Sequence, residues 1–64
     1  MEVGDIYVHY RNTQEYMILG FPAFQDNTGR WVHDAMVLYR DKQGNLFIRP
    51  KVEFEKRFIK KAIV

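Results

Sequence analysis

Cysteine and serine are both absent from this 64-residue chain. Without thiols, neither a disulfide nor a thiolate zinc site can stabilise the core, so apolar packing must hold the fold together. The two absences also remove the usual nucleophiles of hydrolytic sites, and Thr13 and Thr28 both lie in predicted turns. We therefore expect a protein that is not an enzyme, with no catalytic residue and no cofactor.

The chain also lacks a long apolar segment. Its longest uninterrupted apolar run is far shorter than the roughly 18 residues that a membrane span requires. The N-terminal segment carries acidic side chains and does not resemble a signal peptide. Together with the absence of cysteine, which fits a reducing compartment, these features predict a soluble, cytoplasmic protein that is not bound to a membrane.

Aromatic residues are abundant instead: the chain has five Phe, four Tyr and one Trp. Each large ring buries on the order of 150–250 Å². This matters because a chain of this length buries only about 60% of its unfolded surface. The sequence leaves no room for a second domain, and we predict a single domain over residues 1–64 with an aromatic-rich core.

The clearest structural signal lies in residues 31–50, where two apolar runs flank a polar turn. The predicted arms of a hairpin are residues 31–39 and 46–49, and Gly44 between them can adopt the positive φ that a tight turn needs. In the first arm neither alternating face is purely apolar, which indicates a bulge or a twist midway. The second arm should end at Pro50 because proline cannot donate a hydrogen bond to a sheet.

Two further strands are predicted before this hairpin. The alternation of residues 6–10 indicates a strand with one face in the core. Its two faces carry Ile6, Val8 and Tyr10, and Tyr7, His9 and Arg11, respectively. Residues 16–21 are apolar almost throughout, which predicts the most buried strand, ending at Pro22. Turn residues at 26–29 then lead into the hairpin.

After the hairpin, apolar residues at Val52, Phe54 and Phe58 predict a 3₁₀ or single helical turn, followed by a last short strand through Ile59 toward Ile63. A longer helix is not expected, since isolated helices below about 12 residues are marginal in water. Short strands joined by tight turns in so small a chain indicate an all-β fold. We predict a five-stranded, partly open barrel of the SH3-like kind, with an OB-like barrel as the alternative.

The predicted core consists of Ile18, Leu19, Val37, Leu38 and Ile48. Trp31 is either a core residue or an exposed platform for stacking, and as the single Trp of a small domain it is expected to be at least half buried. A domain of this size has only a few kcal/mol of stability. Truncation of a core residue such as Leu19 should therefore prevent folding.

The net charge of +2 is unevenly distributed. Residues 1–28 carry one basic and four acidic side chains, a charge of −3, whereas residues 49–64 carry six basic and two acidic side chains, a charge of +4. A basic segment attracts nucleic acid or an acidic partner, although such charges more often form only a solvated surface.

His9, His33 and Asp34 are the residues that could ligate a metal, because imidazole and carboxylate both bind zinc. Adjacent residues on a strand point to opposite faces, so His33 and Asp34 would not easily share one ion. We therefore predict no metal site.

Two polar residues have a structural interpretation beside a functional one. We expect a ring nitrogen of His9 to form a hydrogen bond with neighbouring backbone, the alternative being a surface contact beside Tyr7 and Arg11. Arg49 is expected to form an ion pair that ties the barrel closed. Its candidate partners are Asp5, Asp34 and Glu53.

Two hypotheses for function follow from a small barrel with many rings. In the first, which we prefer, the domain is a protein–protein interaction module with an aromatic-lined groove. In the second, it binds RNA or single-stranded DNA weakly, through stacked bases and phosphate contacts. Exposed rings interleaved with cations would favour nucleic acid, and a ring patch free of charge would favour a protein. The oligomeric state is expected to be a monomer or a homodimer.

The candidate binding residues are Tyr7, His9, Tyr10, Arg11, Trp31, Tyr39, Phe47 and Arg49. In the nucleic-acid hypothesis the phosphate contacts would be Arg11, Arg30, Arg40, Lys42, Arg49 and Lys51. Weak binding is expected because each phosphate contact to a single strand contributes a slope of about −0.7 in log affinity against log salt.

Four segments of the chain carry a resemblance to a known family: GDIYVHYR, EYMILGF, VLYRD and LFIRPKVEF. In order and spacing they resemble, over nearly the whole chain, the small bacterial family catalogued as domain of unknown function 1653. The positions that fall on its pattern are Gly4, Tyr7 (offset by one), His9, Tyr10, Arg11, Tyr16, Leu19, Gly20, Leu38, Tyr39, Phe47, Arg49, Pro50 and Phe54. The positions that depart from it are Phe24, His33, Asp34 and Ala35. The resemblance supports the small β fold and implies no particular activity.

Overall fold

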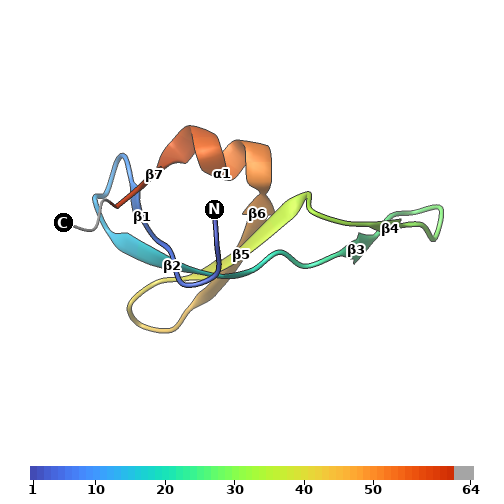
Figure 1. Ribbon diagram of the computed structural model, residues 1–64, viewed down its shortest axis with the longest axis horizontal. Helices are drawn as coiled ribbons and strands as arrows, with labels where there is room; N and C mark the ends of the chain where they lie inside the picture. Colours follow the sequence, from blue (N-terminus) through green and yellow to red (C-terminus); the bar gives the residue numbers. More distant parts are fainter. Residues whose placement is uncertain (62–64) are drawn as a thin grey trace.

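The computed structural model describes residues 1–61 and consists mainly of antiparallel strands (Figure 1). Five strands form one sheet in the order β6-β5-β2-β1-β7. Their bounds are β1 (Ile6–His9), β2 (Glu15–Gly20), β5 (Met36–Arg40), β6 (Leu46–Pro50) and β7 (Phe58–Lys60). The helix α1 (Lys51–Arg57) connects β6 to β7. The prediction of a β-rich fold with a helical segment near the C-terminus is confirmed.

The turn of the predicted hairpin and the strand segments on both sides of it are also confirmed. β5 and β6 pair in antiparallel fashion, with Tyr39 opposite Phe47. Gly44 in the connecting turn has a φ of 88°. The Asp41 carboxylate stabilises this turn because its Oδ1 accepts hydrogen bonds from the backbone N–H groups of residues 43 and 45, at 3.0 and 2.9 Å.

The first half of the hairpin differs from the prediction of one strand over residues 31–39. Its start, β4 (Trp31–Val32), pairs with β3 (Phe24–Gln25) in a separate two-stranded sheet. The chain then changes direction at Asp34, which has a φ of 58°. The β3–β4 ribbon projects from the five-stranded sheet (Figure 1), so the molecule measures 43 × 22 × 21 Å. Trp31 on the ribbon is 59% exposed, and the expectation that it is at least half buried is wrong.

The core lies on the face of the sheet that α1 covers, which we call the inner face (Figure 1). Its buried side chains are Tyr7, Ile18, Val37, Tyr39, Phe54 and Phe58. The Phe54 ring of α1 is fully buried, with ring centroids 5.2 Å from Tyr7, 5.0 Å from Tyr39 and 4.0 Å from Phe58. An aromatic-rich core is therefore confirmed, and so are Ile18 and Val37 as core residues.

The other three predicted core residues, Leu19, Leu38 and Ile48, lie outside this cluster. Ile48 is 54% exposed. The reason is strand alternation: Val37 is buried on the inner face, its cross-strand partner Arg49 shares that face, and Ile48 pairs with Leu38 on the outer face. Leu19 occupies a register shift in β2. β2 is the central strand, but it has one buried residue where β5 has two, so it is not the most buried strand.

The helix α1 extends further than the single turn predicted. Glu53 in its first turn and Lys56 and Arg57 in its last turn complement the helix dipole. The Glu53 carboxylate also lies 3.6 Å from Lys56 Nζ and 3.8 Å from Arg57 Nη2. Seven residues do not form a stable helix in isolation, so burial of Phe54 must stabilise α1. The predicted extension of the last strand toward Ile63 lies outside the described residues.

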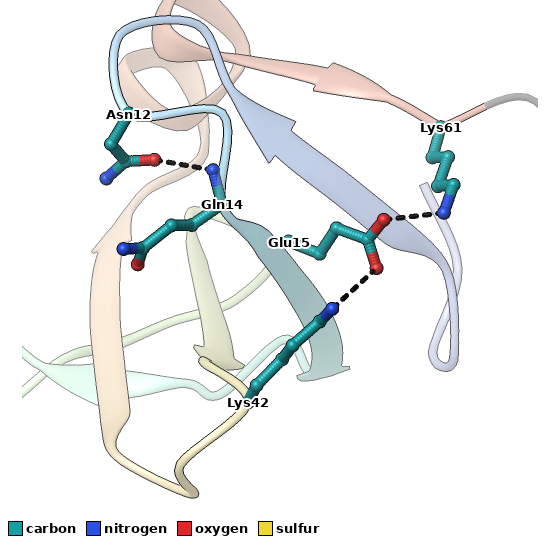
Figure 2. Close-up of polar contacts among 5 residues, drawn as sticks. All are labelled: Asn12, Gln14, Glu15, Lys42 and Lys61. Atoms are coloured by element: carbon teal, nitrogen blue, oxygen red, sulfur yellow. Dashed lines mark hydrogen bonds and ion pairs between the residues drawn. The ribbon is translucent and has the colours of Figure 1, made fainter.

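The acidic first part of the chain and its basic last part meet in the fold because β1 pairs with β7. Lys60 Nζ lies 3.5 Å from the Asp5 carboxylate. Figure 2 shows Glu15 between two lysines, 2.5 Å from Lys61 Nζ and 3.6 Å from Lys42 Nζ. The hydrogen bond from Lys61 lowers the pKa of Glu15. Much of the charge asymmetry seen along the sequence is therefore neutralised within the fold.

Candidate binding site

A hollow of about 170 Å³ opens on the inner face of the sheet. Its lining residues are His9, Asn12, Tyr16, Tyr39, Phe47, Arg49 and Phe58. They come from all five strands of the main sheet and from the β1–β2 turn. Since no pairing between β6 and β7 closes the sheet within residues 1–61, side chains of β6 on one edge and of β1 and β7 on the other face the same space. We call this space the aromatic hollow.

Strand alternation explains why these side chains gather there. His9 pairs with Phe58, and Tyr39 pairs with Phe47, so each pair shares one face of the sheet. Phe58 and Tyr39 are buried core residues. Their partners therefore also lie on the inner face, toward its edge.

Arg49 is held in the aromatic hollow without an ion pair. Its Nε donates a hydrogen bond to the Tyr39 hydroxyl at 3.2 Å, and its Cζ lies 5.7 Å from the centroid of the Phe58 ring. In the part of the chain that the structure describes, no carboxylate lies within ion-pair distance of Arg49. The predicted ion pair with Asp5, Asp34 or Glu53 is wrong, because alternation places Arg49 among aromatic rings.

His9 has the structural hydrogen bond that we expected. Its Nδ1 accepts the backbone N–H of Arg11 at 3.1 Å. The imidazole also packs edge-on against Phe58, with centroids 4.9 Å apart, and stacks on Tyr10 at 5.3 Å. Burial lowers the pKa of His9, and the nearby charges of Arg49, Arg11 and Arg57 lower it further. Both effects favour the neutral imidazole.

The rest of the wall is aromatic with a few hydroxyl and amide groups. The Tyr16 hydroxyl accepts a hydrogen bond from Asn12 Nδ2 at 3.2 Å. Asn12 is held in turn because its Oδ1 accepts the backbone N–H of Gln14 at 2.8 Å (Figure 2). Phe47 stacks on Tyr39, with centroids 5.5 Å apart, and remains 41% exposed. Phe47 thus presents an accessible ring beside Arg49.

The structure brings together four of the eight predicted site residues: His9, Tyr39, Phe47 and Arg49 line the aromatic hollow. Two more, Tyr10 and Arg11, lie next to His9. Tyr10 is exposed, and its hydroxyl accepts a hydrogen bond from Arg11 Nε at 2.9 Å. The remaining two lie elsewhere. Tyr7 is buried against Phe54, so it is not the surface contact considered beside His9, and Trp31 lies on the ribbon.

Three lining residues were not among the predicted site residues: Asn12, Tyr16 and Phe58. Phe58 could have been added to the site once the β1–β7 pairing was known, because Phe58 is the cross-strand partner of His9 and lies on the same face. That pairing joins distant parts of the chain and has no local sequence signal. Asn12 belongs to a turn, where the sequence pattern does not define a side-chain direction.

Two other hollows lie near Glu15 and Lys42, with volumes of about 190 and 330 Å³. Both are bordered by the ion pairs of Glu15 shown in Figure 2, so Glu15 and Lys42 already have partners there. Among residues 1–61, no group of three or more His, Cys, Asp or Glu side chains could hold a metal ion. In the same residues, no helix combines the length and apolar character needed to cross a membrane. The aromatic hollow is therefore the best-supported candidate site.

Comparisons with known protein families, with curated proteins and with solved structures gave no match. Function must therefore be argued from the chemistry of the aromatic hollow.

Proposed function

We propose that this protein is a small, non-enzymatic binding module of the SH3-like type, and that the aromatic hollow binds a segment of a protein partner. The observation that carries the proposal is the accessible Phe47 ring beside the guanidinium of Arg49, which has no carboxylate partner among residues 1–61. Aromatic and arginine side chains in partly enclosed sites contribute most of the energy in protein interfaces. The SH3-like interpretation draws support from the sheet, in which the last strand returns to pair with the first.

One observation favours nucleic acid as a second candidate. Rings and cations alternate around the aromatic hollow: the Arg11 guanidinium lies 5.5 Å from the Tyr10 centroid, and Arg49 lines the same hollow as Phe47. Sites for single-stranded nucleic acid combine these two features.

Two further observations favour a protein partner. Four of the basic residues after position 50, Lys56, Arg57, Lys60 and Lys61, already lie within ion-pair distance of carboxylates. The rings available at the hollow are also few: Tyr10 already stacks on His9, and Phe47 already uses one face against Tyr39. A strand of several nucleotides needs a series of free rings and cations.

The proposal is tested by selecting peptides from a random display library on the immobilised domain and measuring their affinity in solution. We expect Phe47→Ala to weaken binding of selected peptides at least tenfold, which corresponds to about 1.4 kcal/mol. The matched control is Phe24→Ala, because Phe24 on the ribbon is 40% exposed, nearly the same as Phe47 at 41%. This control should bind like the wild type.

Labelled single-stranded RNA and DNA are titrated in parallel at low and physiological salt. Equal losses of peptide affinity in Phe47→Ala and Phe24→Ala would show that the peptides do not bind in the aromatic hollow. Failure to select any peptide, together with sub-micromolar nucleic-acid binding that persists at physiological salt, would make the second candidate the function.

A further inference from the structure

We propose that the aromatic hollow recognises a carboxylate group of the partner, an acidic side chain or a C-terminal carboxylate, through the terminal nitrogens of Arg49. This inference rests on the proposed function, since it names the chemical group that occupies the site.

The Arg49 guanidinium is oriented before any ligand binds. Its Nε is committed to the Tyr39 hydroxyl, and the ring of Phe58 lies beneath it. Within residues 1–61, no carboxylate lies within ion-pair distance of either terminal nitrogen. These nitrogens present parallel N–H groups, the arrangement that binds the two oxygens of a carboxylate.

The other polar groups of the aromatic hollow are also donors. His9 Nδ1 accepts a hydrogen bond, so the proton of the neutral imidazole is on Nε2. The hydroxyls of Tyr16 and Tyr39 accept hydrogen bonds from Asn12 and Arg49, so each can still donate its own proton. As far as residues 1–61 form it, the lining contains no Asp or Glu. A ligand that supplies acceptors and a negative charge therefore complements the hollow.

The number of cations that line the hollow indicates a single negative charge rather than a phosphate dianion. Arg11 and Arg57 also lie near His9, but neither lines the hollow, and Arg57 lies 3.8 Å from the Glu53 carboxylate. Among the described residues, Arg49 is the one cation in the lining. One guanidinium matches one carboxylate, whereas phosphate sites commonly gather several cations.

The test is an NMR titration of the ¹⁵N-labelled domain with phenylacetate at constant ionic strength. Phenylacetamide has nearly the same shape without the charge, and inorganic phosphate supplies the competing anion. We expect phenylacetate to shift the Arg49 Nε–H signal and the backbone signals of His9 and Phe47 in a saturable manner. Phenylacetamide should bind at least tenfold more weakly, and phosphate should not saturate these shifts.

Variants of Arg49 test whether its guanidinium is the group that binds phenylacetate. Arg49→Gln should weaken phenylacetate binding at least tenfold. Arg49→Lys keeps the charge but not the parallel N–H groups, and it should weaken binding as well. The matched control, Arg40→Gln, removes a cation on the outer face of β5 and should leave binding unchanged. Backbone spectra show whether each variant is folded, and Arg49→Lys provides the answer if Arg49→Gln does not fold.

Peptides selected in the display experiment separate the two sources of carboxylate. Amidation of the C-terminus should abolish binding if the terminal carboxylate is recognised, and Glu→Gln or Asp→Asn replacement should do so if a side chain is recognised. Equal binding of phenylacetate and phenylacetamide, or tighter saturable binding of phosphate, would overturn the inference.

The inference and the proposed function can fail separately. Peptides that bind through Phe47 but are unaffected by Arg49→Gln would overturn the carboxylate and leave the interaction module intact. Binding of phenylacetate that depends on Arg49, without any peptide binding, would leave the carboxylate site intact and overturn the protein partner.

Discussion

His9 illustrates how a single residue is adjusted by its neighbours. Its imidazole is partly buried between Phe58 and Tyr10, and three arginines lie close enough to disfavour a positive charge on the ring. Both influences act in the same direction. As a result, the residue keeps the protonation state in which one nitrogen accepts from the backbone and the other donates.

We predict that the pKa of His9 in the folded protein lies below its ordinary value of 6.5. Since folding disfavours protonation, its contribution to stability is fully present above pH 6.5 and is lost as the pH falls from there through the folded pKa. NMR of the imidazole C–H signals against pH measures the value directly. Arg49→Gln should raise it toward 6.5, whereas Arg40→Gln should not, and a wild-type pKa at or above 6.5 would contradict the prediction.

A second residue-scale prediction concerns glycine. Gly44 has a φ of 88°, and a Cβ added there would meet no heavy atom within 4 Å, so any cost of Gly44→Ala comes from the backbone alone. We expect a loss of about 1–2 kcal/mol. Gly20→Ala is the matched control, because its Cβ would also meet nothing within 4 Å but its φ is not positive. Urea unfolding measures both, and equal effects would show that the turn does not require glycine.

The sequence predicts which residues of β6 belong to the candidate site better than it predicts which face of β6 packs into the core. The sequence identifies Phe47 and Arg49 as candidate site residues, but which face of β6 belongs to the core depends on its pairing with β5. Ile48 is more apolar than Arg49 and was therefore predicted to be the inward residue. In the fold the aromatic rings fill the core, and an arginine stem beside them leaves its polar end at the open edge.

At the scale of secondary structure, α1 depends on one side chain. Its seven residues are too few to be stable through helix propensity, and Phe54 is its one buried residue. The helix closes one side of the core because Phe54 contacts rings from β1, β5 and β7. Loss of this ring therefore affects three strands together.

We predict that Phe54→Ala costs about 3–5 kcal/mol and leaves the domain unfolded at room temperature. The control within the same helix is Val52→Ala, whose side chain is 65% exposed and whose loss should change stability by about 0.5 kcal/mol or less. Far-ultraviolet circular dichroism during urea unfolding distinguishes the two. Cooperative unfolding of Phe54→Ala at the wild-type midpoint would show that the core does not depend on α1.

The elements that the sequence predicted well are those with strong local signals. The turn at residues 41–45 places Asp, Gly and Asn where each is needed. The strand after it and the second half of the predicted strand before it were identified correctly. The β3–β4 ribbon was missed because each of its strands has only two residues, too few for any alternation to be recognised. Its own turn, centred on Asp26 and Gly29, was predicted.

At the scale of the whole molecule, the ribbon is separable from the core. Its strands pair with each other, and none of its residues belongs to the hydrophobic cluster. Figure 1 shows it extending away from α1 and the five-stranded sheet. The binding site proposed above is built from other elements, so the ribbon should be dispensable for both folding and binding.

We predict that replacing residues 25–31 with Asn-Gly leaves the fold intact. Phe24 and Val32 face each other as strand partners, and a two-residue turn can join such a pair. The thermal midpoint should change by about 4 °C or less. Affinity for phenylacetate should be unchanged. A loss of cooperative unfolding would show that the ribbon contributes to the stability of the main sheet.

The two-sided pairing of β1 has a consequence for how the domain is made. Tyr7 pairs with Tyr16, close in sequence, and with Lys60, near the opposite end of the chain. During synthesis the β1–β2 hairpin can form early, but β7, the partner of the other edge of β1, leaves the ribosome about 50 residues later. Long-range pairings of this kind form slowly. Until β7 arrives, the open edge of β1 is the surface through which nascent chains are most prone to associate.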